Sequence, residues 1–234
     1  MTIDEVLQRL ASLGRPEYVE SMSRFGITAV KSFGISTPVL KQFASEVKKQ
    51  ADDPHLLALE LWKTGNYDAR AVAFLIDDPK KVTRKQMDAW AADFDNWATV
   101  DGTCCYLFCR SAFAYEKVVE WSGMKPEFVK RAGFSLMAYL AIHDKKADDM
   151  KLASFLPVIE KYANDERNFV KKAVNWALRQ IGKRNLELNK LAVETADRIK
   201  LQNTKPARWI ASDALRELKS ESVMNRLRGK TNRE

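Results

Sequence analysis

Apolar side chains along this chain recur at intervals of three and four residues, and the strict alternation typical of a strand is missing. The spacing is clearest in four segments, VLQRLASL, PVLKQFASEV, HLLALELW and ARAVAFLI. Because three to four residues make one turn of a helix, each segment predicts a helix with one apolar side. The pattern therefore predicts an all-α fold.

Short turn signals separate these apolar stripes, and each of them contains a proline, which is disfavoured inside a helix. The signals lie at residues 13–16, 33–38, 51–54, 77–81, 123–126 and 202–206. No longer linker rich in Gly, Ser or Pro interrupts the series. We therefore expect a single domain over residues 1–225, followed by a basic, frayed tail at residues 226–234.

A faint internal repeat is visible in the second half of the chain. The segment EFVKRAGFSLMAYL aligns with NFVKKAVNWALRQI at an offset of 41 residues, which pairs Phe128 with Phe169. WALRQI is echoed by DALREL at an offset of 37 residues. Periods near 40 in a helical chain are typical of HEAT or armadillo repeats, whose helix pairs stack into a solenoid with a concave face. A plain helical bundle with chance similarity is the alternative.

The net charge of the 234-residue chain is +8, and the excess of basic residues belongs to the second half. Residues 1–124 contain 15 Lys and Arg against 17 Asp and Glu, whereas residues 125–234 contain 24 against 14. If the repeats stack, basic residues on equivalent helices recur along one groove, and such a groove suits a phosphate backbone. A solvated surface with surplus lysine is the plainer alternative. The residues concerned are Lys130, Arg131, Lys171, Lys172, Arg179, Lys183, Arg184, Lys205 and Arg208.

Other classes of protein find little support in the sequence. No apolar run reaches the length of a membrane span, and the acidic, amphipathic start is unlike a signal peptide, so we expect a cytoplasmic protein, associated with the nucleoid in a prokaryote. The cysteines Cys104, Cys105 and Cys109 are too close together for a disulfide framework, and we expect them reduced and buried. His55 and His143 are too far apart for a typical zinc site. We expect neither a metal nor a cofactor.

The segment FDNWATVDGTCCYLF places Trp97 four residues before Asp101, so the two side chains project from the same side of a helix. Asp95 or Asn96 is suited to cap that helix. The next turn is small and apolar, so the carboxylate lies at the edge of a buried surface, where it needs a partner or a function. A core Trp97 and a solvated Asp101 are the alternatives. The same alternative of core packing holds for Trp176 in the second half.

Four short motifs occur in order: ESMSRFGITAVKSFGISTP at 20–38, NWATVDG at 96–102, VKRAGFSL at 129–136 and VNWALRQIGK at 174–183. In these motifs the chain resembles the AlkD-like DNA alkylation repair glycosylases, a family built from HEAT-like helical repeats. The resemblance covers nearly the whole chain. It implies the same all-α solenoid, with a concave basic face.

The resemblance also implies a function and a set of residues. The function is that of a monofunctional DNA glycosylase, a monomer that removes purines alkylated at N3 or N7 from double-stranded DNA. Asp101 resembles the catalytic carboxylate, Trp97 and Trp176 resemble the aromatic walls around the damaged nucleotide, and Arg131 and Arg179 resemble phosphate contacts. The further DNA contacts that we expect are Phe25, Lys130, Lys171, Lys172 and Lys183.

Two residues depart from the family pattern. Ala98 stands where the family often has an aspartate, and Phe25 stands where it often has a tyrosine. Some relatives bind DNA without excising a base. A DNA-structure-binding repeat protein without chemistry, and a helical-repeat adaptor for a protein partner, therefore stay open as alternatives.

The chemistry agrees with the few acid and base candidates in the sequence. A purine alkylated at N3 or N7 is cationic and leaves as a neutral base, so its departure needs no general acid. One carboxylate near the anomeric carbon can stabilise the oxocarbenium-like sugar and orient a water molecule. We predict that Trp97, Asp101, Arg131 and Trp176 line one concave surface.

Overall fold

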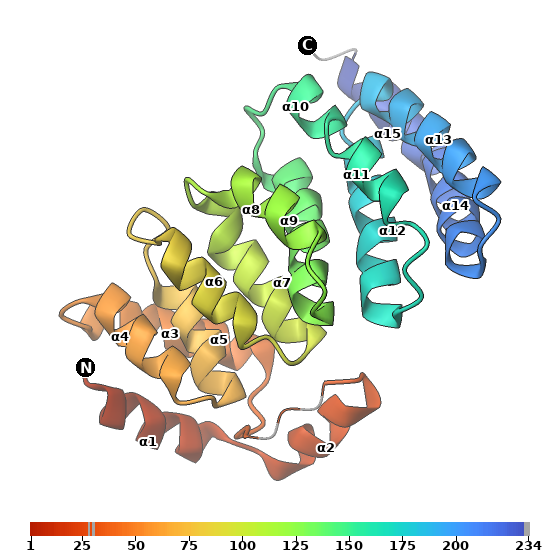
Figure 1. Cartoon of the computed structure of the whole chain (residues 1–234). Coiled ribbons are helices and arrows are strands. Elements are labelled where there is room, and N and C mark those ends of the chain that lie inside the picture. The colour runs from red at the N-terminus through yellow and green to blue at the C-terminus, as the bar shows by residue number, and fades with distance from the viewer. Residues whose placement is uncertain (28, 30, 232–234) are drawn as a thin grey trace. The chain divides into compact units, whose positions relative to one another are not determined.

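The computed structural model describes residues 1–27, 29 and 31–231, and all regular secondary structure in these residues is helical. The predicted all-α fold is confirmed. The chain divides into two compact units, Met1–Ala114 and Tyr115–Glu234 (Figure 1). The expected single domain over residues 1–225 stays a prediction. Within the described residues, no helix combines the length and the apolar character that crossing a membrane requires.

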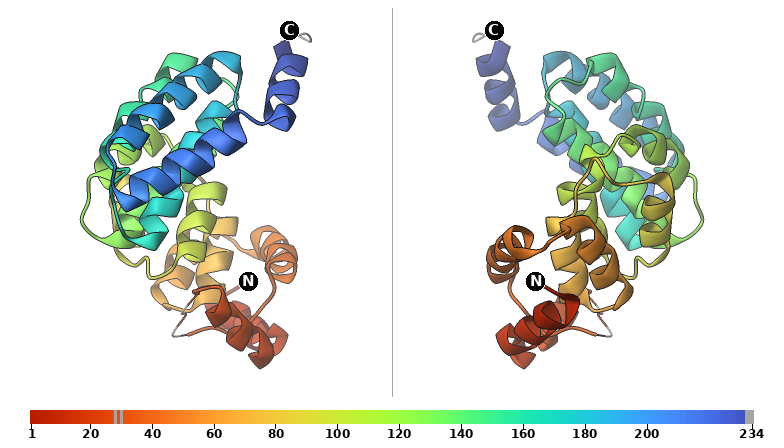
Figure 2. Two further views of the ribbon diagram at one scale, coloured as in Figure 1. Left: turned by 90° about the vertical axis from the view of Figure 1, so that its right-hand side faces the viewer. Right: turned by 90° about the vertical axis from the view of Figure 1, so that its left-hand side faces the viewer.

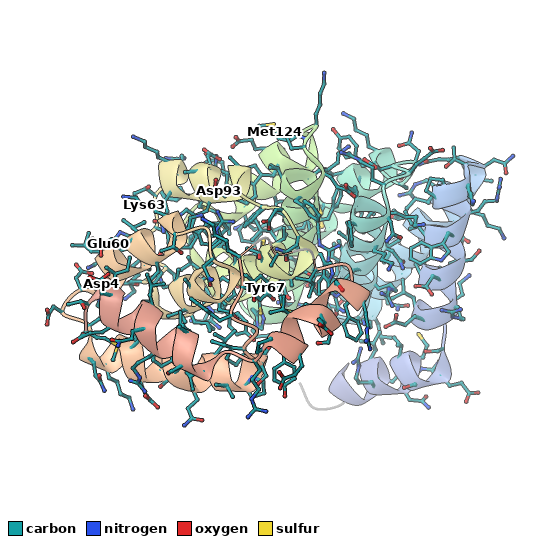
Figure 3. The ribbon with its side chains drawn as sticks, turned by 90° about the horizontal axis from the view of Figure 1, so that it is seen from below. Asp4, Glu60, Lys63, Tyr67, Asp93 and Met124 are labelled. Carbon is teal, nitrogen blue, oxygen red and sulfur yellow. The ribbon has the colours of Figure 1, made fainter. Side chains whose placement is uncertain are left out.

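The first unit is built around three helices that lie side by side, α3, α5 and α7, with α5 in the middle and α4 packed against it (Figure 1). The described helices of this unit are α1 (Ile3–Leu13), α2 (Pro16–Arg24), α3 (Thr37–Gln50), α4 (Pro54–Lys63), α5 (Tyr67–Ile76), α6 (Arg84–Ala92), α7 (Trp97–Tyr106) and the 3-10 helix η1 (Phe108–Arg110). Trp62 of α4 stacks on Trp90 of α6, with ring centroids 3.9 Å apart. Its Nε1 donates a hydrogen bond of 2.9 Å to Asp93, just after α6. Asp93 is labelled in Figure 3. This pair joins α4 to α6 through a buried aromatic stack.

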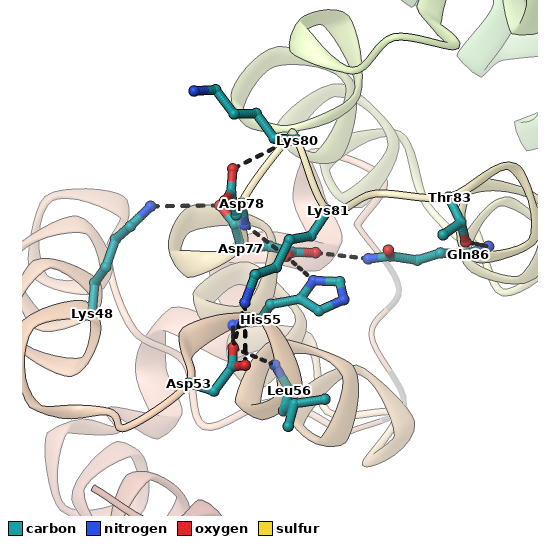
Figure 4. Close-up of polar contacts among 10 residues, drawn as sticks. All are labelled: Lys48, Asp53, His55, Leu56, Asp77, Asp78, Lys80, Lys81, Thr83 and Gln86. Carbon is teal, nitrogen blue, oxygen red and sulfur yellow. Dashed lines mark hydrogen bonds and ion pairs between the residues drawn. The ribbon is translucent and has the colours of Figure 1, made fainter.

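A buried carboxylate, Asp77, joins the end of α5 to α4 and α6 (Figure 4). It lies 2.6 Å from Nδ1 of His55 and accepts a hydrogen bond of 2.7 Å from the side-chain amide of Gln86. The backbone N–H of Asp78 donates to it as well, at 2.7 Å. Since a buried carboxylate needs several such partners, we assign His55 a structural role here.

Several helices, among them α5 and α7, begin where the sequence supplies a capping side chain. Asn66 precedes α5 and accepts hydrogen bonds from the N–H groups of Asp68 and Ala69. Asn96 precedes α7 and accepts one of 2.9 Å from the N–H of Thr99, which confirms one of the two predicted caps. Because the first N–H groups of a helix have no partner within it, these side chains fix the first residue of each helix.

The second unit contains a row of three helices, α9, α12 and α14, with α12 in the middle, while α13 packs against both α12 and α14 (Figures 1 and 2). The described helices of this unit are α8 (Ala114–Ser122), α9 (Glu127–His143), α10 (Asp149–Ala153), α11 (Leu156–Lys161), α12 (Asn168–Gly182), α13 (Leu186–Leu201), α14 (Lys205–Leu218) and α15 (Glu221–Thr231). Phe128 of α9 contacts Phe169 of α12, with ring centroids 5.4 Å apart. The residues that the repeat pairs at an offset of 41 therefore meet across neighbouring helices.

The C-terminal segment is helical up to Thr231, where α15 ends, and Leu227 within this helix is fully buried. The frayed tail that we expect over residues 226–234 stays a prediction. The remaining tail residues, 232–234, lie outside the described residues.

Candidate functional site

Trp97 and Asp101 lie one turn apart on α7, and both are half-buried. The side of α7 that carries Thr99, Val100 and Thr103 is buried instead. Trp97 is therefore not a core tryptophan. The pair occupies the boundary between the packed interior of the first unit and its surface, as the apolar residues after Asp101 indicate.

Close packing at the next residue fixes the position of Asp101. A Cβ atom at Gly102 would lie 2.5 Å from Cζ of Phe74 on α5, closer than side chains tolerate. The Phe74 ring in turn stacks on Tyr106, one turn further along α7, with ring centroids 6.0 Å apart. Glycine at position 102 thus lets α7 pack closely against α5. This close packing determines how far the Asp101 carboxylate lies from the interior of the unit.

The end of α2 is bound to the same tryptophan. Trp97 Nε1 donates a hydrogen bond of 2.9 Å to the backbone carbonyl of Phe25, the residue that caps α2. The chain then turns at Gly26, whose φ of 72° is in the region that favours glycine. The Phe25 side chain is 70% exposed. Phe25 and Trp97, both predicted for the site and 72 positions apart in the sequence, are thus in contact through the backbone carbonyl of Phe25.

A buried aspartate that the sequence analysis does not single out holds the segment between α2 and α3. Asp68 of α5 is fully buried, and it accepts hydrogen bonds from the hydroxyl of Ser32 at 2.8 Å and the N–H of Phe33 at 2.6 Å. The N–H groups of Gly34 and Ile35 donate to it at 3.3 and 3.2 Å. Its only signal in the sequence is a carboxylate at the start of the apolar helix YDARAVAFLI. Because this segment follows α2 in the chain, its hydrogen bonds to Asp68 also help to hold the C-terminal end of α2 in position.

In the second unit, Trp176 of α12 is half-buried like Trp97. Its ring meets Tyr139 of α9 edge to face, with centroids 4.9 Å apart and planes at 89°. With the amide oxygen of Gln180 turned toward it, Trp176 Nε1 donates to that oxygen at 3.0 Å. The indole is therefore held in place along one edge and partly open to solvent.

The predicted basic stripe separates into several environments, and its first members are buried. Lys130 is 9% exposed and pairs with Asp165 at 3.2 Å, while Arg131 is 6% exposed and donates to the carbonyl of Phe169 at 2.7 Å. Burial alone would raise the pKa of Asp165, but hydrogen bonds from Arg167 and Lys130 outweigh it and hold that pKa below its usual value. Phosphate contacts by Lys130 and Arg131 stay a prediction, because both side chains already join α9 to the start of α12.

Carboxylates of α14 accompany the last basic residues of α12. Glu217 pairs with Arg179 and, at 2.6 Å, with Lys183, and Arg179 also lies 3.7 Å from Asp213. Burial tends to raise the pKa of Glu217, yet the hydrogen bonds from Lys183 and Arg179 lower it overall. Arg184 donates instead to the carbonyls of Ala141 and Asp144. At this end of the helix much of the positive charge is already balanced within the unit.

The remaining basic residues are more open. Lys172 of α12, together with Lys205 and Arg208 of α14, is exposed, and Lys171 lies over the ring of Trp209 at 4.9 Å from its centroid. Within the described part of the chain, Lys171, Lys172 and Lys205 form no ion pair. The part of the stripe that is free to meet a phosphate backbone therefore lies at the N-terminal ends of α12 and α14.

Comparison with known proteins decides the family. A model of the DNA alkylation repair enzymes matches residues 6–218, most of the chain. The chain belongs to this family. No curated protein matches the sequence. A solved structure described as a new family of proteins related to the HEAT-like repeat DNA glycosylases, with affinity for branched DNA structures, is 24% identical and has a TM-score of 0.75. The alignment covers 93% of this chain and 95% of that one.

The predicted resemblance and the HEAT-like repeat fold are thereby confirmed. The DNA alkylation repair family member described here has its candidate residues in both units, with Phe25, Trp97 and Asp101 in the first and Arg131 and Trp176 in the second. The prediction that they line one concave surface stays a prediction. In the structure, Trp97 contacts the end of α2, and Trp176 contacts Tyr139.

The three cysteines lie on α7 and just after it. Cys104 and Cys109 are buried and Cys105 is half-buried, and all three are thiols outside any disulfide bond. Burial, followed by the nearby Cys105, raises the pKa of Cys109 to about 12, so its thiol is a poor nucleophile. Within the described residues, no cluster of His, Cys, Asp and Glu is suited to hold a metal ion.

Proposed function

We propose that the protein is a DNA glycosylase that excises cationic purines, alkylated at N3 or N7, from duplex DNA. The observation that carries this proposal is the pair of Trp97 and Asp101, one turn apart and half-buried on α7. Membership of the DNA alkylation repair family supports it. Packing of Gly102 and the hydrogen bond to Phe25 hold both side chains in place, as a catalytic pair requires.

In the proposed reaction, the bond between the anomeric carbon and the base nitrogen breaks, and its electron pair neutralises the cationic base. The sugar is left with oxocarbenium character, which the negative charge of Asp101 stabilises. Water then bonds to the anomeric carbon and loses a proton to the solvent. The ring of Trp97 favours the cationic base by a cation–π interaction of roughly 0.5 to 2 kcal/mol.

The basic residues of the second unit fit contacts to the DNA backbone. Lys171, Lys172 and Lys205 have no carboxylate partner among the described residues, so their charges are available to phosphates. Arg179 and Lys183 would have to exchange Glu217 for a phosphate. We expect binding to duplex DNA that weakens steeply as salt rises, in a cytoplasmic monomer without a cofactor.

The test is release of 7-methylguanine from methylated duplex DNA. We expect release by the wild-type protein and a loss of roughly 10²- to 10³-fold in the Asp101→Asn variant, the scale of about 3 to 4 kcal/mol for one lost electrostatic stabiliser. Asp52→Asn, a matched change at an exposed aspartate of the same unit, should release the base at the wild-type rate. Undiminished release by Asp101→Asn, together with a marked fall in melting temperature, would make Asp101 a structural residue.

A second candidate is binding to DNA structures without base excision. The similar solved structure is described as having affinity for branched DNA, and Ala98 and Phe25 depart from the family pattern in the motifs around the site. Under this alternative, wild-type protein binds branched DNA and releases no base above the uncatalysed rate. The assay above therefore separates the two candidates.

A further inference from the structure

An exposed tryptophan stands at the start of α14. Trp209 is 40% exposed, whereas the other side of this helix carries the fully buried Ala207, Ile210, Ala211 and Ala214. Thr204 caps the helix by accepting a hydrogen bond from the N–H of Ala207. The indole therefore projects from a well-anchored first turn and is not required to fill the interior behind α14.

Positive charge lies close to this ring. Lys171 of α12 lies over it at 4.9 Å from the centroid, and Lys172 and Lys205 are exposed on the same two helices. Arg208 is exposed as well, and its guanidinium donates hydrogen bonds to the neutral carbonyl and amide oxygens of Asn203, at 2.7 and 2.9 Å. A ring next to several cations is well placed for a partner that is both aromatic and anionic.

The nearest carboxylate on α14 is already engaged. Asp213, one turn beyond Trp209, accepts a hydrogen bond of 2.7 Å from Asn175 and pairs with Arg179 and Arg216. The seam between α12 and α14 thus has two unlike ends. At one end carboxylates balance the cations, and at the other Lys171 lies over an exposed indole, while Lys172 and Lys205 form no ion pair within the described residues.

We propose that Trp209, Lys171, Lys172 and Lys205 form a binding site for single-stranded DNA. One unpaired base stacks on the exposed indole, and the lysines contact the flanking phosphates. This inference rests on the proposed function, because it takes DNA as the ligand. Bases inside a duplex are stacked on one another and do not offer a face, so an exposed aromatic side chain selects unpaired nucleotides.

The site would let the protein hold DNA in which a duplex continues into an unpaired segment. Stacking is tolerant of sequence because every base has a π face, and the lysine contacts depend on charge alone. We therefore expect a preference for the form of the DNA and little preference for its sequence.

The test compares a plain duplex, the same duplex with a single-stranded tail, and the single strand alone, by fluorescence anisotropy at one salt concentration. Wild-type protein should bind the tailed duplex more tightly than the plain one. Trp209→Ala should weaken binding to the single strand and to the tail by roughly 5- to 100-fold, and binding to the plain duplex by less than about twofold. Trp209→Phe keeps an aromatic face and should retain most of the affinity.

Val119→Ala serves as the matched control, because Val119 is 62% exposed and lies on α8, which carries none of the residues of the proposed site. It should leave all three dissociation constants unchanged. Melting temperatures establish that the variants fold. Equal losses on plain and tailed duplexes, or no loss on any DNA, overturn the proposal; the second outcome leaves the indole to a protein partner.

This result is separable from the proposed function. Suppose that wild-type protein releases no methylated base, yet its preference for the tailed duplex depends on Trp209. The proposed glycosylase activity is then overturned, and the single-strand site is supported. If the base is released and Trp209→Ala leaves the preference for the tail unchanged, the single-strand site alone is overturned.

Discussion

Two half-buried tryptophans, Trp97 at the start of α7 and Trp176 in the middle of α12, have different surroundings. Trp97 shares its side of the helix with a carboxylate, and its indole is bound to the backbone of a distant helix end. Trp176 lies on a helix that carries several cations, and Lys171, Arg179 and the neighbouring Lys183 meet partners on α14. The charge count agrees, with an excess of two acidic residues in residues 1–124 and of ten basic residues in 125–234.

The difference teaches how one residue type serves two tasks. Beside a carboxylate, an indole can border a cationic base while the negative charge stabilises the sugar. Beside lysines, an indole belongs to a surface that attracts phosphates. Under the proposed function, the first unit would carry out the chemistry and the second would attach to the DNA backbone.

The largest expected effect on binding to duplex DNA comes from reversing the charge of the attachment surface. The double variant Lys171→Glu and Lys172→Glu should weaken binding to duplex DNA by roughly 10- to 100-fold at low salt, for all sequences alike. Loss of two phosphate contacts should also reduce the slope of log affinity against log salt by about 2. Titrations at several salt concentrations measure both quantities.

The control is the double variant Lys190→Glu and Lys200→Glu, two exposed lysines on α13. It changes the net charge by the same amount and should have a much smaller effect. Equal losses in both double variants would show that net charge alone attracts the DNA, and the assignment of attachment to the start of α12 would be wrong.

An intermediate effect is expected at the balanced end of the α12–α14 seam. Glu217→Gln removes the negative charge next to Arg179 and Lys183, so both cations become available to phosphates. We expect affinity for duplex DNA to rise roughly threefold, and stability to fall by about 1 kcal/mol or less at neutral pH. Glu187→Gln, at an exposed position of α13, is the control. Weaker DNA binding by Glu217→Gln would mean that the carboxylate positions Arg179 for its contact.

The same carboxylate gives a pH dependence with a definite sign. The pKa of Glu217 in the folded protein lies below its usual value of 4.5, because of hydrogen bonds from Lys183 and Arg179 that outweigh burial. Its contribution to stability is thus present above pH 4.5 and is lost as the pH falls through the lowered pKa. Melting curves of wild type and Glu217→Gln should differ at neutral pH and converge in acid.

Much of the fold follows from local signals. All six predicted breaks fall between helices or at their ends, as at Pro54 and Lys205, where the proline or its neighbour opens the next helix. The pairing of Trp97 with Asp101 needed only the helical period, and Asn96 was recognisable as a cap. These features depend on residues within one or two turns of each other, which a sequence displays directly.

The environment of the basic residues depended on contacts between helices. The sequence alone predicts a basic stripe without its partners Asp213 and Glu217, because these carboxylates come close to α12 only when α14 packs beside it. The burial of Lys130 and Arg131 had a signal, since the RAGFSLMAYLA segment of α9 is apolar on all sides and predicts a helix enclosed on all sides. The anchor at Asp68 had almost none, because its partners lie more than 30 residues away.

The smallest expected effect concerns Phe25, where the family often has a tyrosine. The hydrogen bond from Trp97 goes to the backbone carbonyl of this residue, so the side chain is free to vary without losing it. Because the Phe25 ring is 70% exposed, the added hydroxyl of Phe25→Tyr meets solvent. We expect base release within about twofold of the wild type and stability within about 0.5 kcal/mol. Trp97→Phe removes the donor and should cost about 1 kcal/mol of stability, besides lowering release. A gain of tenfold or more in release by Phe25→Tyr would instead place the missing hydroxyl in the chemistry, and the contrast between the two tryptophans would then rest on the α2 end as much as on Asp101.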